Sequence, residues 1–212
     1  KKTYTSTIMP LRGAWLEYET DGNDIFWVRV DRTRKIPITT LLRAIGLVSD
    51  DQIRALFGEE ALLETTIQKD PIKTGEEALI EIYKKLRPGE LPTVEAAKSL
   101  FNGLFFDNRR YDLAKVGRYK FNQKLSIANR IKNQVAFEDI MDKETGEVFV
   151  TAGEVISAEA AEAIQNAGIN VVDIKFGEKK LRIIGNGIVN IHSVLPNVDL
   201  SSLHIKEYVN YE

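Results

Sequence analysis

Apolar and polar positions alternate in the first part of the chain, which is the period of a β-strand. Residues 4–19 are extended in pattern, with Thr3, Thr5 and Thr7 alternating with larger side chains. Residues 21–24 (DGND) have the composition of a turn, and residues 25–30 are rich in aromatic and β-branched residues. Two such runs around a short turn predict an antiparallel hairpin.

The period then changes to that of helices. Residues 38–45 and 50–57 read as helices, and a third apolar stripe is formed by Leu79, Ile82, Tyr83 and Leu86. Each predicted start has a residue that can accept a hydrogen bond from the first turn or open it: Pro37, Ser49, Thr74 and Thr93. Residues 107–124 are dense in basic and aromatic residues and read as a loop with a short helix.

The pattern of the last third of the chain indicates a separate structural unit. A turn at residues 142–147 precedes a short strand at 148–150, Ser157 can cap an alanine-rich helix to residue 166, and a strand follows at 169–175. Residues 181–194 are again strand-like around a GNG turn. We therefore expect an α+β fold with three segments: residues 1–134, an inserted β module at 135–176, and a strand segment at 177–212 that completes the module or returns to the first segment.

The amino-acid composition limits the classes of protein to which the chain can belong. The chain has 212 residues, 43% hydrophobic residues, a formal net charge of -2, no cysteine and two histidines. Disulfides and thiolate metal sites are excluded, and the usage fits a reducing, cytoplasmic location. No apolar run approaches membrane length, so no membrane partner is expected. The start lacks Met and opens directly into a strand pattern, which predicts a piece of a longer chain.

The near-neutral total hides strong local charges. Residues 29–43 contain five basic residues and one acid, residues 109–132 contain eight basic residues and one acid, and residues 138–162 contain eight acids and one base. The basic stretches are interleaved with Trp15, Trp27, Tyr111, Tyr119 and Phe121, a pattern typical of nucleic-acid surfaces. A solvated basic face paired with nearby acids is the alternative that composition leaves open.

No motif for catalysis is present. The sequence lacks the phosphate-binding GxxxxGK[ST] loop and the GxGxxG, HExxH and GxSxG patterns. His192 and His204 have no nucleophile or metal-ligand context around them. We expect no catalytic residue, no metal site and no cofactor in this chain.

Several stretches resemble the β subunit of bacterial RNA polymerase. Their sequences are most similar to those of the Gram-positive type. They are residues 10–19 (PLRGAWLEYE), 28–37 (VRVDRTRKIP), 41–44 (LLRA), 86–97 (LRPGELPTVEAA), 104–106 (LFF), 110–113 (RYDL) and 116–122 (VGRYKFN). They occur in the family's order and spacing and together cover most of residues 1–125. The stretches TGEV at 145–148, AGEVI at 152–156 and AGI at 167–169 resemble the small sandwich-barrel modules of the family's large subunits.

The resemblance implies the lobe, the second domain of β, with a lineage-type sandwich-barrel insertion. The family's lobe lines the DNA channel beside the downstream duplex and the non-template strand. In the family, the tryptophan of the RGxW motif stacks on an unpaired non-template base. Trp15 matches this position, so the resemblance favours stacking over the alternative, an aromatic side chain packed on a strand. Trp27 lacks the motif and is expected in the core. The DNA-binding residues expected from the resemblance and from exposure are Arg12, Trp15, Arg29, Arg32, Arg34, Lys35, Arg110 and Arg118.

The resemblance also implies what surrounds the chain. The whole enzyme is a DNA-directed RNA polymerase, a nucleotidyltransferase whose magnesium ion is held by β′, in the cytoplasm and nucleoid of a bacterium. Its partners are DNA and the β′, α and σ subunits. The alternative function is a protein-docking platform for σ factor, β′ or transcription regulators, and the acidic insertion favours protein over DNA as its own neighbour.

Overall fold

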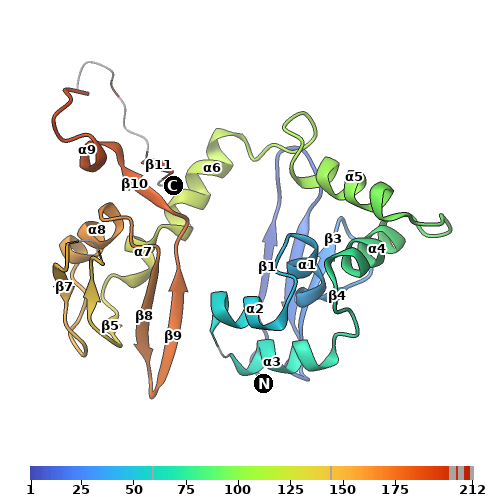
Figure 1. Ribbon diagram of the computed structural model, residues 1–212, viewed down its shortest axis with the longest axis horizontal. Coiled ribbons are helices and arrows are strands. Elements are labelled where there is room, and N and C mark those ends of the chain that lie inside the picture. The colour runs from blue at the N-terminus through green and yellow to red at the C-terminus, as the bar shows by residue number, and fades with distance from the viewer. Residues whose placement is uncertain (59, 144, 201–203, 205–207, 211–212) are drawn as a thin grey trace. The chain divides into compact units, whose positions relative to one another are not determined.

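The computed structural model describes residues 1–58, 60–143, 145–200, 204 and 208–210. Contacts between Cα atoms divide the chain into two compact units, Lys1–Gly117 and Arg118–Glu212 (Figure 1). The segment boundaries expected at residues 134 and 176 stay a prediction. Of the expected third segment, residues 201–203, 205–207 and 211–212 lie outside the described residues.

The first unit contains an antiparallel sheet of four strands in chain order. These are β1 (Thr5–Ile8), β2 (Leu16–Thr20), β3 (Phe26–Val30) and β4 (Ile36–Pro37). β2 and β3 form the predicted hairpin, with Leu16 opposite Val30 and Thr20 opposite Phe26. Strand alternation then gives the sheet two faces. Its inner face includes the buried Val28 and Val30, and its outer face holds Thr5, Thr7, Glu17, Glu19, Trp27 and Arg29.

Five helices of the first unit follow the sheet. They are α1 (Ile38–Ala44), α2 (Asp50–Phe57), α3 (Ala61–Lys69), α4 (Gly75–Leu86) and α5 (Val94–Phe105). Ser49, Thr74 and Thr93 accept hydrogen bonds from the first turns of α2, α4 and α5, so these three predicted caps are confirmed. The core joins the inner face to the helices through buried residues such as Val28, Ile53 and Ile82.

A buried polar cluster fixes α1 against the end of α3. The Asp70 carboxylate is 2% exposed and accepts hydrogen bonds from the hydroxyls of Thr39 and Thr40, which are both fully buried. It also accepts a hydrogen bond from the Ile72 backbone N–H at 2.9 Å. Because the side chains of Thr39, Thr40 and Asp70 are buried, the two hydroxyls depend on the carboxylate as their acceptor.

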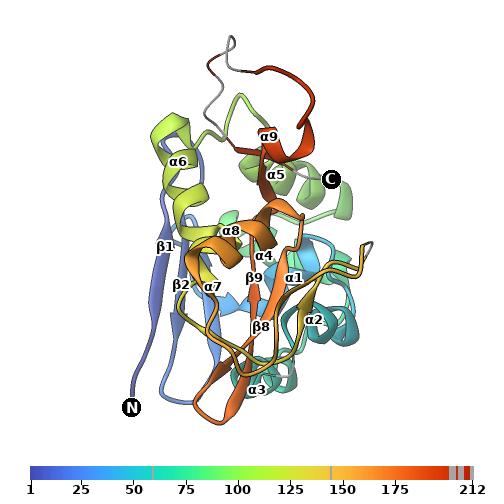
Figure 2. The ribbon, with the colours of Figure 1, turned by 90° about the vertical axis from the view of Figure 1, so that its left-hand side faces the viewer.

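The second unit contains short strands and helices. α6 (Ala114–Leu125) leads into it and is followed by α7 (Ile127–Ile131), β5 (Val135–Ala136), β6 (Ile140–Met141), β7 (Val148–Val150), α8 (Ala158–Asn166), β8 (Val171–Phe176), β9 (Lys179–Ile184), β10 (Ile188–Asn190), α9 (Ile191–Val194) and β11 (Tyr208–Asn210). β8 and β9 pair along their whole length as one long hairpin (Figure 2). Ile131, Ile156 and Ile164 are fully buried in a second core of its own.

The α+β class is confirmed, and the sandwich-barrel detail is not. Within the described residues the second unit has a three-stranded sheet (β5-β8-β9) and two two-stranded pairs (β6-β7 and β10-β11), with no closed barrel. The predicted cap at Ser157 is confirmed, because its hydroxyl accepts a hydrogen bond from the Ala160 N–H. The expected loop with a short helix at residues 107–124 is in part a helix of 12 residues, α6.

Replacing Asp70 with Ala should lower the free energy of unfolding of the first unit by about 3 kcal/mol, because two buried hydroxyls lose their acceptor. Urea denaturation followed by tryptophan fluorescence reports on this unit, since Trp15 and Trp27 both lie in it. The control is Asp51→Ala, whose side chain is 94% exposed, with an expected change under about 0.5 kcal/mol. Equal effects of the two substitutions would contradict the account of this cluster.

Candidate nucleic-acid interface

The segment between β1 and β2 meets the segment after α5. The backbone N–H of Arg12 donates to the carbonyl of Asp112 at 3.1 Å, and the N–H of Asp112 donates to the carbonyl of Arg12 at 2.8 Å. Figure 1 shows the loop after α5 reaching the end of the sheet where β1 stops and β2 begins. Two motifs that are far apart in the sequence, RGAW and RYDL, are therefore neighbours.

Gly13 makes this approach possible. Its φ is +123°, a conformation that side chains with a Cβ rarely adopt. A Cβ on this residue would lie 2.6 Å from Cδ2 of Tyr111 and 3.2 Å from the carbonyl oxygen of Arg110. The Tyr111 ring also contacts Phe105, with 6.1 Å between ring centroids. Tyr111 therefore packs against Gly13 and Phe105, and only glycine fits beside it at position 13.

Trp15 lies at the same end of the sheet, just before β2. Its carbonyl accepts a hydrogen bond of 2.8 Å from the N–H of Asp31, which extends the β2–β3 ladder by one step. Strand alternation continued from β2 places the indole on the outer face, while Ala14 is buried. The indole is half-buried, and the guanidinium carbon of Arg32 lies 4.6 Å from its ring centroid. The Trp15 side chain is thus neither buried in the core nor fully exposed to solvent.

Arg29 and Lys35 share one carboxylate. Glu19 lies 3.5 Å from Arg29 and 2.9 Å from Lys35, measured between nitrogen and oxygen. The hydrogen bond from Lys35, with smaller contributions from the charges of Lys35 and Arg29, holds the pKa of Glu19 below its usual value. Glu19 therefore stays ionised near neutral pH, and a phosphate that binds either cation must compete with it.

Trp27 is not in the core, contrary to the sequence expectation. It lies on the outer face, where its indole N–H donates to the Asp21 carboxylate at 2.9 Å. The ammonium of Lys35 lies 4.9 Å from its ring centroid. The indole N–H explains the difference, because this polar group needs a hydrogen-bond partner and finds one in Asp21, in the turn between β2 and β3.

The other expected cations differ in their surroundings. Arg12 and Arg34 are exposed, and neither forms an ion pair within the part of the chain that the structure describes. The Arg110 side chain is 72% exposed, with Nε 3.5 Å from the Asp107 carboxylate. Arg118 is exposed on α6 and belongs to the second unit. Whether any of these residues binds DNA stays a prediction.

Arg43, counted in the first basic segment, is an interior residue. It is 1% exposed and donates to the Val48 carbonyl and to the Asp50 carboxylate. It stabilises the connection between α1 and α2, so the basic segment offers fewer surface cations than its composition indicated. Sequence reasoning also missed Glu19 as a partner, although alternation in the predicted hairpin places Glu17, Glu19 and Arg29 on one face.

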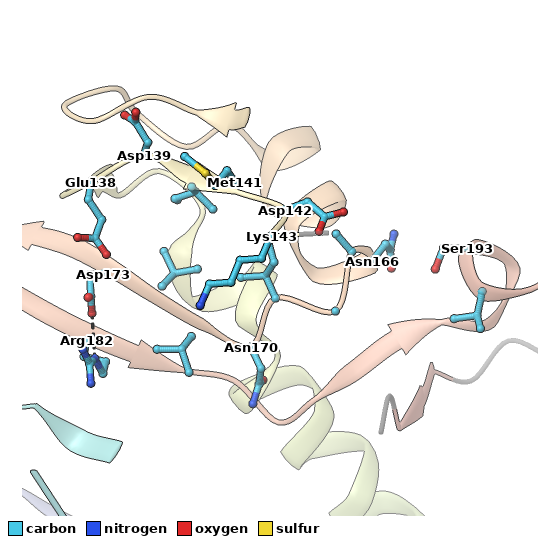
Figure 3. Close-up of a pocket in the computed structure, with 17 residues that line it drawn as sticks. Glu138, Asp139, Met141, Asp142, Lys143, Asn166, Asn170, Asp173, Arg182 and Ser193 are labelled. Atoms are coloured by element: carbon cyan, nitrogen blue, oxygen red, sulfur yellow. Dashed lines mark hydrogen bonds and ion pairs between the residues drawn. The ribbon is translucent and has the colours of Figure 1, made fainter. Parts of the chain in front are cut away.

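The second unit has a cavity of about 840 Å³. Figure 3 shows Asp173 joined to Arg182 at one end of it and the side chain of Lys143 extending between its walls. Burial by itself raises the pKa of Asp173, but hydrogen bonds from Lys180 and Arg182 outweigh burial and keep the pKa below its usual value.

Among the described residues no group of acids and histidines could hold a metal ion. None of the helices in the described ranges is long and apolar enough to cross a membrane.

Comparison with known proteins gives one consistent family. The model of the family described as RNA polymerase Rpb2, domain 2, matches residues 1–142. The chain is 60% identical over 212 residues to the DNA-directed RNA polymerase subunit beta of Clostridioides difficile strain 630, and 57% identical over 211 residues to that of Clostridium novyi strain NT. In both cases the match covers 100% of the chain, which spans 17% of the length of the relative.

Gly13→Ala should lower the free energy of unfolding of the first unit by about 1–3 kcal/mol, because the backbone is strained for alanine and the new methyl group meets Tyr111. Gly22→Ala is the control, since a Cβ there meets nothing within 4 Å. Its expected change is under about 0.5 kcal/mol. Denaturation followed by tryptophan fluorescence measures both, and an unchanged stability for Gly13→Ala would contradict the close packing.

Proposed function

Because the chain belongs to the family of RNA polymerase Rpb2 domain 2, we propose that it is the lobe of a bacterial DNA-directed RNA polymerase β subunit and serves in transcription. The lobe lines the DNA channel, beside the downstream duplex and the non-template strand. The chain itself contributes binding and no chemistry. In the whole nucleotidyltransferase, magnesium belongs to β′, and β′, α and σ are the partner subunits. The setting is the bacterial cytoplasm and nucleoid.

The observation that supports DNA contact is the grouping at one end of the sheet. Trp15 lies between the ends of β1 and β3, Arg32 lies over its ring, and the Arg12 backbone is bridged to the RYDL segment. An aromatic face can stack on any unpaired base, and guanidinium groups bind phosphates. This end of the sheet thus offers both kinds of contact that a single strand of DNA needs.

The basic side chains differ in how readily they could bind a phosphate group. Arg12, Arg34 and Arg110 are exposed and have weak or no ion pairs within the described residues, so they are the strongest candidates for direct phosphate contacts. Arg29 and Lys35 already share Glu19, so they supply a local positive field more than a direct contact. Arg118, also a candidate from the sequence, is exposed on α6 of the second unit.

A second candidate function is a docking platform for σ factor, β′ or a transcription regulator. The cavity of the second unit favours it, because Met141 and Val171 line this cavity and are each 44% exposed. Apolar side chains in a concave site with polar neighbours are typical of protein interfaces. Binding of a protein partner that is insensitive to salt, together with DNA affinity that is unchanged by substitutions in the first unit, would favour this function.

Trp15→Ala in the complete polymerase should weaken binding to a fork DNA with an unpaired non-template strand by about 5-fold to 150-fold, the value of one base–aromatic stack. Fluorescence of 2-aminopurine placed in that strand measures both affinity and stacking. Trp27→Phe is the matched control, because this residue lies at the other end of the hairpin and is bound to Asp21. Unchanged affinity and fluorescence for Trp15→Ala would refute the proposed contact.

A further inference from the structure

The turn between β3 and β4 has an unusual backbone. Asp31 and Arg32 have φ values of 50° and 62°, and the N–H of Thr33 donates to the carbonyl of Val30 at 3.2 Å. Positive φ at both central residues is the pattern of a type I′ turn, in which Asn, Asp and Gly are favoured. Aspartate tolerates this conformation, but arginine has no such preference. The second central position of this turn is therefore occupied by Arg32, a residue type that does not favour positive φ.

This turn is tied directly to Trp15. The N–H of Asp31 donates to the Trp15 carbonyl at 2.8 Å, which fixes the backbone of the tryptophan. The next residue, Arg32, has its guanidinium carbon 4.6 Å from the centroid of the indole. A planar, weakly hydrated guanidinium over an indole is a favourable cation–π pair. One turn therefore fixes both the main chain and the ring of the same residue.

We propose that Arg32 is a positioning residue that covers one face of Trp15 and presents the other face to an unpaired base. This inference rests on the proposed stacking role of Trp15. It gives Arg32 a different task from a phosphate contact, because its cation acts through the indole. The left-handed backbone at residue 32 is then explained, since it places the guanidinium over the ring.

The two roles of Arg32 make opposite predictions. A phosphate contact adds independently to stacking and contributes about one unit to the slope of log affinity against log salt. A positioning residue has no effect once the ring is removed, because its contribution passes through that ring. The salt slope then stays the same when Arg32 is replaced.

Arg32→Gly separates function from folding. Glycine adopts positive φ without strain, so this substitution should leave the thermal stability of the polymerase unchanged or raise it. The fork DNA with 2-aminopurine in the unpaired non-template strand should nevertheless bind about 3-fold to 30-fold more weakly, with reduced stacking. Arg32→Lys, which keeps a cation that can reach the ring, should restore most of the affinity.

The deciding measurement is the double-mutant cycle in the complete polymerase. We expect Arg32→Gly to weaken fork binding when Trp15 is present and to change nothing further in a Trp15→Ala background, with an unchanged salt slope. Independent, multiplying effects with a slope lower by about one would overturn the proposal and leave the stacking role of Trp15 intact. No effect of Trp15→Ala by itself would overturn the proposed function, and the inference with it.

Discussion

Trp15, Arg29 and Arg32 lie together because β2 and β3 pair antiparallel with Leu16 opposite Val30. This register places the start of one strand beside the end of the next, and the hydrogen bond from Asp31 to Trp15 continues it beyond the strands. A shift by one residue would move every side chain of β3 to the other face. The buried Val28 and Val30 oppose such a shift, so the core of the first unit determines the geometry of its surface site.

Electrostatics then decides which cations are available at this surface. Glu19 is shared by Arg29 and Lys35, Asp50 holds Arg43 in the interior, and Asp107 lies 3.5 Å from Arg110, whose side chain is nevertheless 72% exposed. A count of basic residues therefore overestimates the positive charge that a phosphate would meet. Among the exposed arginines, Arg32 lies over the ring of Trp15. This arrangement suits a strand of DNA that offers both a charged backbone and unstacked bases.

Local signals made most of the elements predictable. Hydroxyl residues followed by apolar stripes located α2, α4, α5 and α8, and the DGND turn located the β2–β3 hairpin. α3 begins at Ala61, its N-cap residue Glu60 accepts no side-chain cap hydrogen bond, and the sequence analysis did not predict this helix. The candidate site was predictable as a set of residues through resemblance, but not as an arrangement. The fit of Gly13 against Tyr111 and the left-handed backbone at Arg32 depend on contacts that no local pattern encodes.

In the assembled polymerase, we expect the end of the sheet marked by Trp15 to face single-stranded DNA. Photo-crosslinking can test this orientation, with p-benzoylphenylalanine placed at position 15 of the β subunit and, separately, at position 27. In open promoter complexes we expect position 15 to crosslink to the unpaired non-template strand and position 27 to give no comparable product. Crosslinks from position 15 to protein alone, or none at all, would contradict the account.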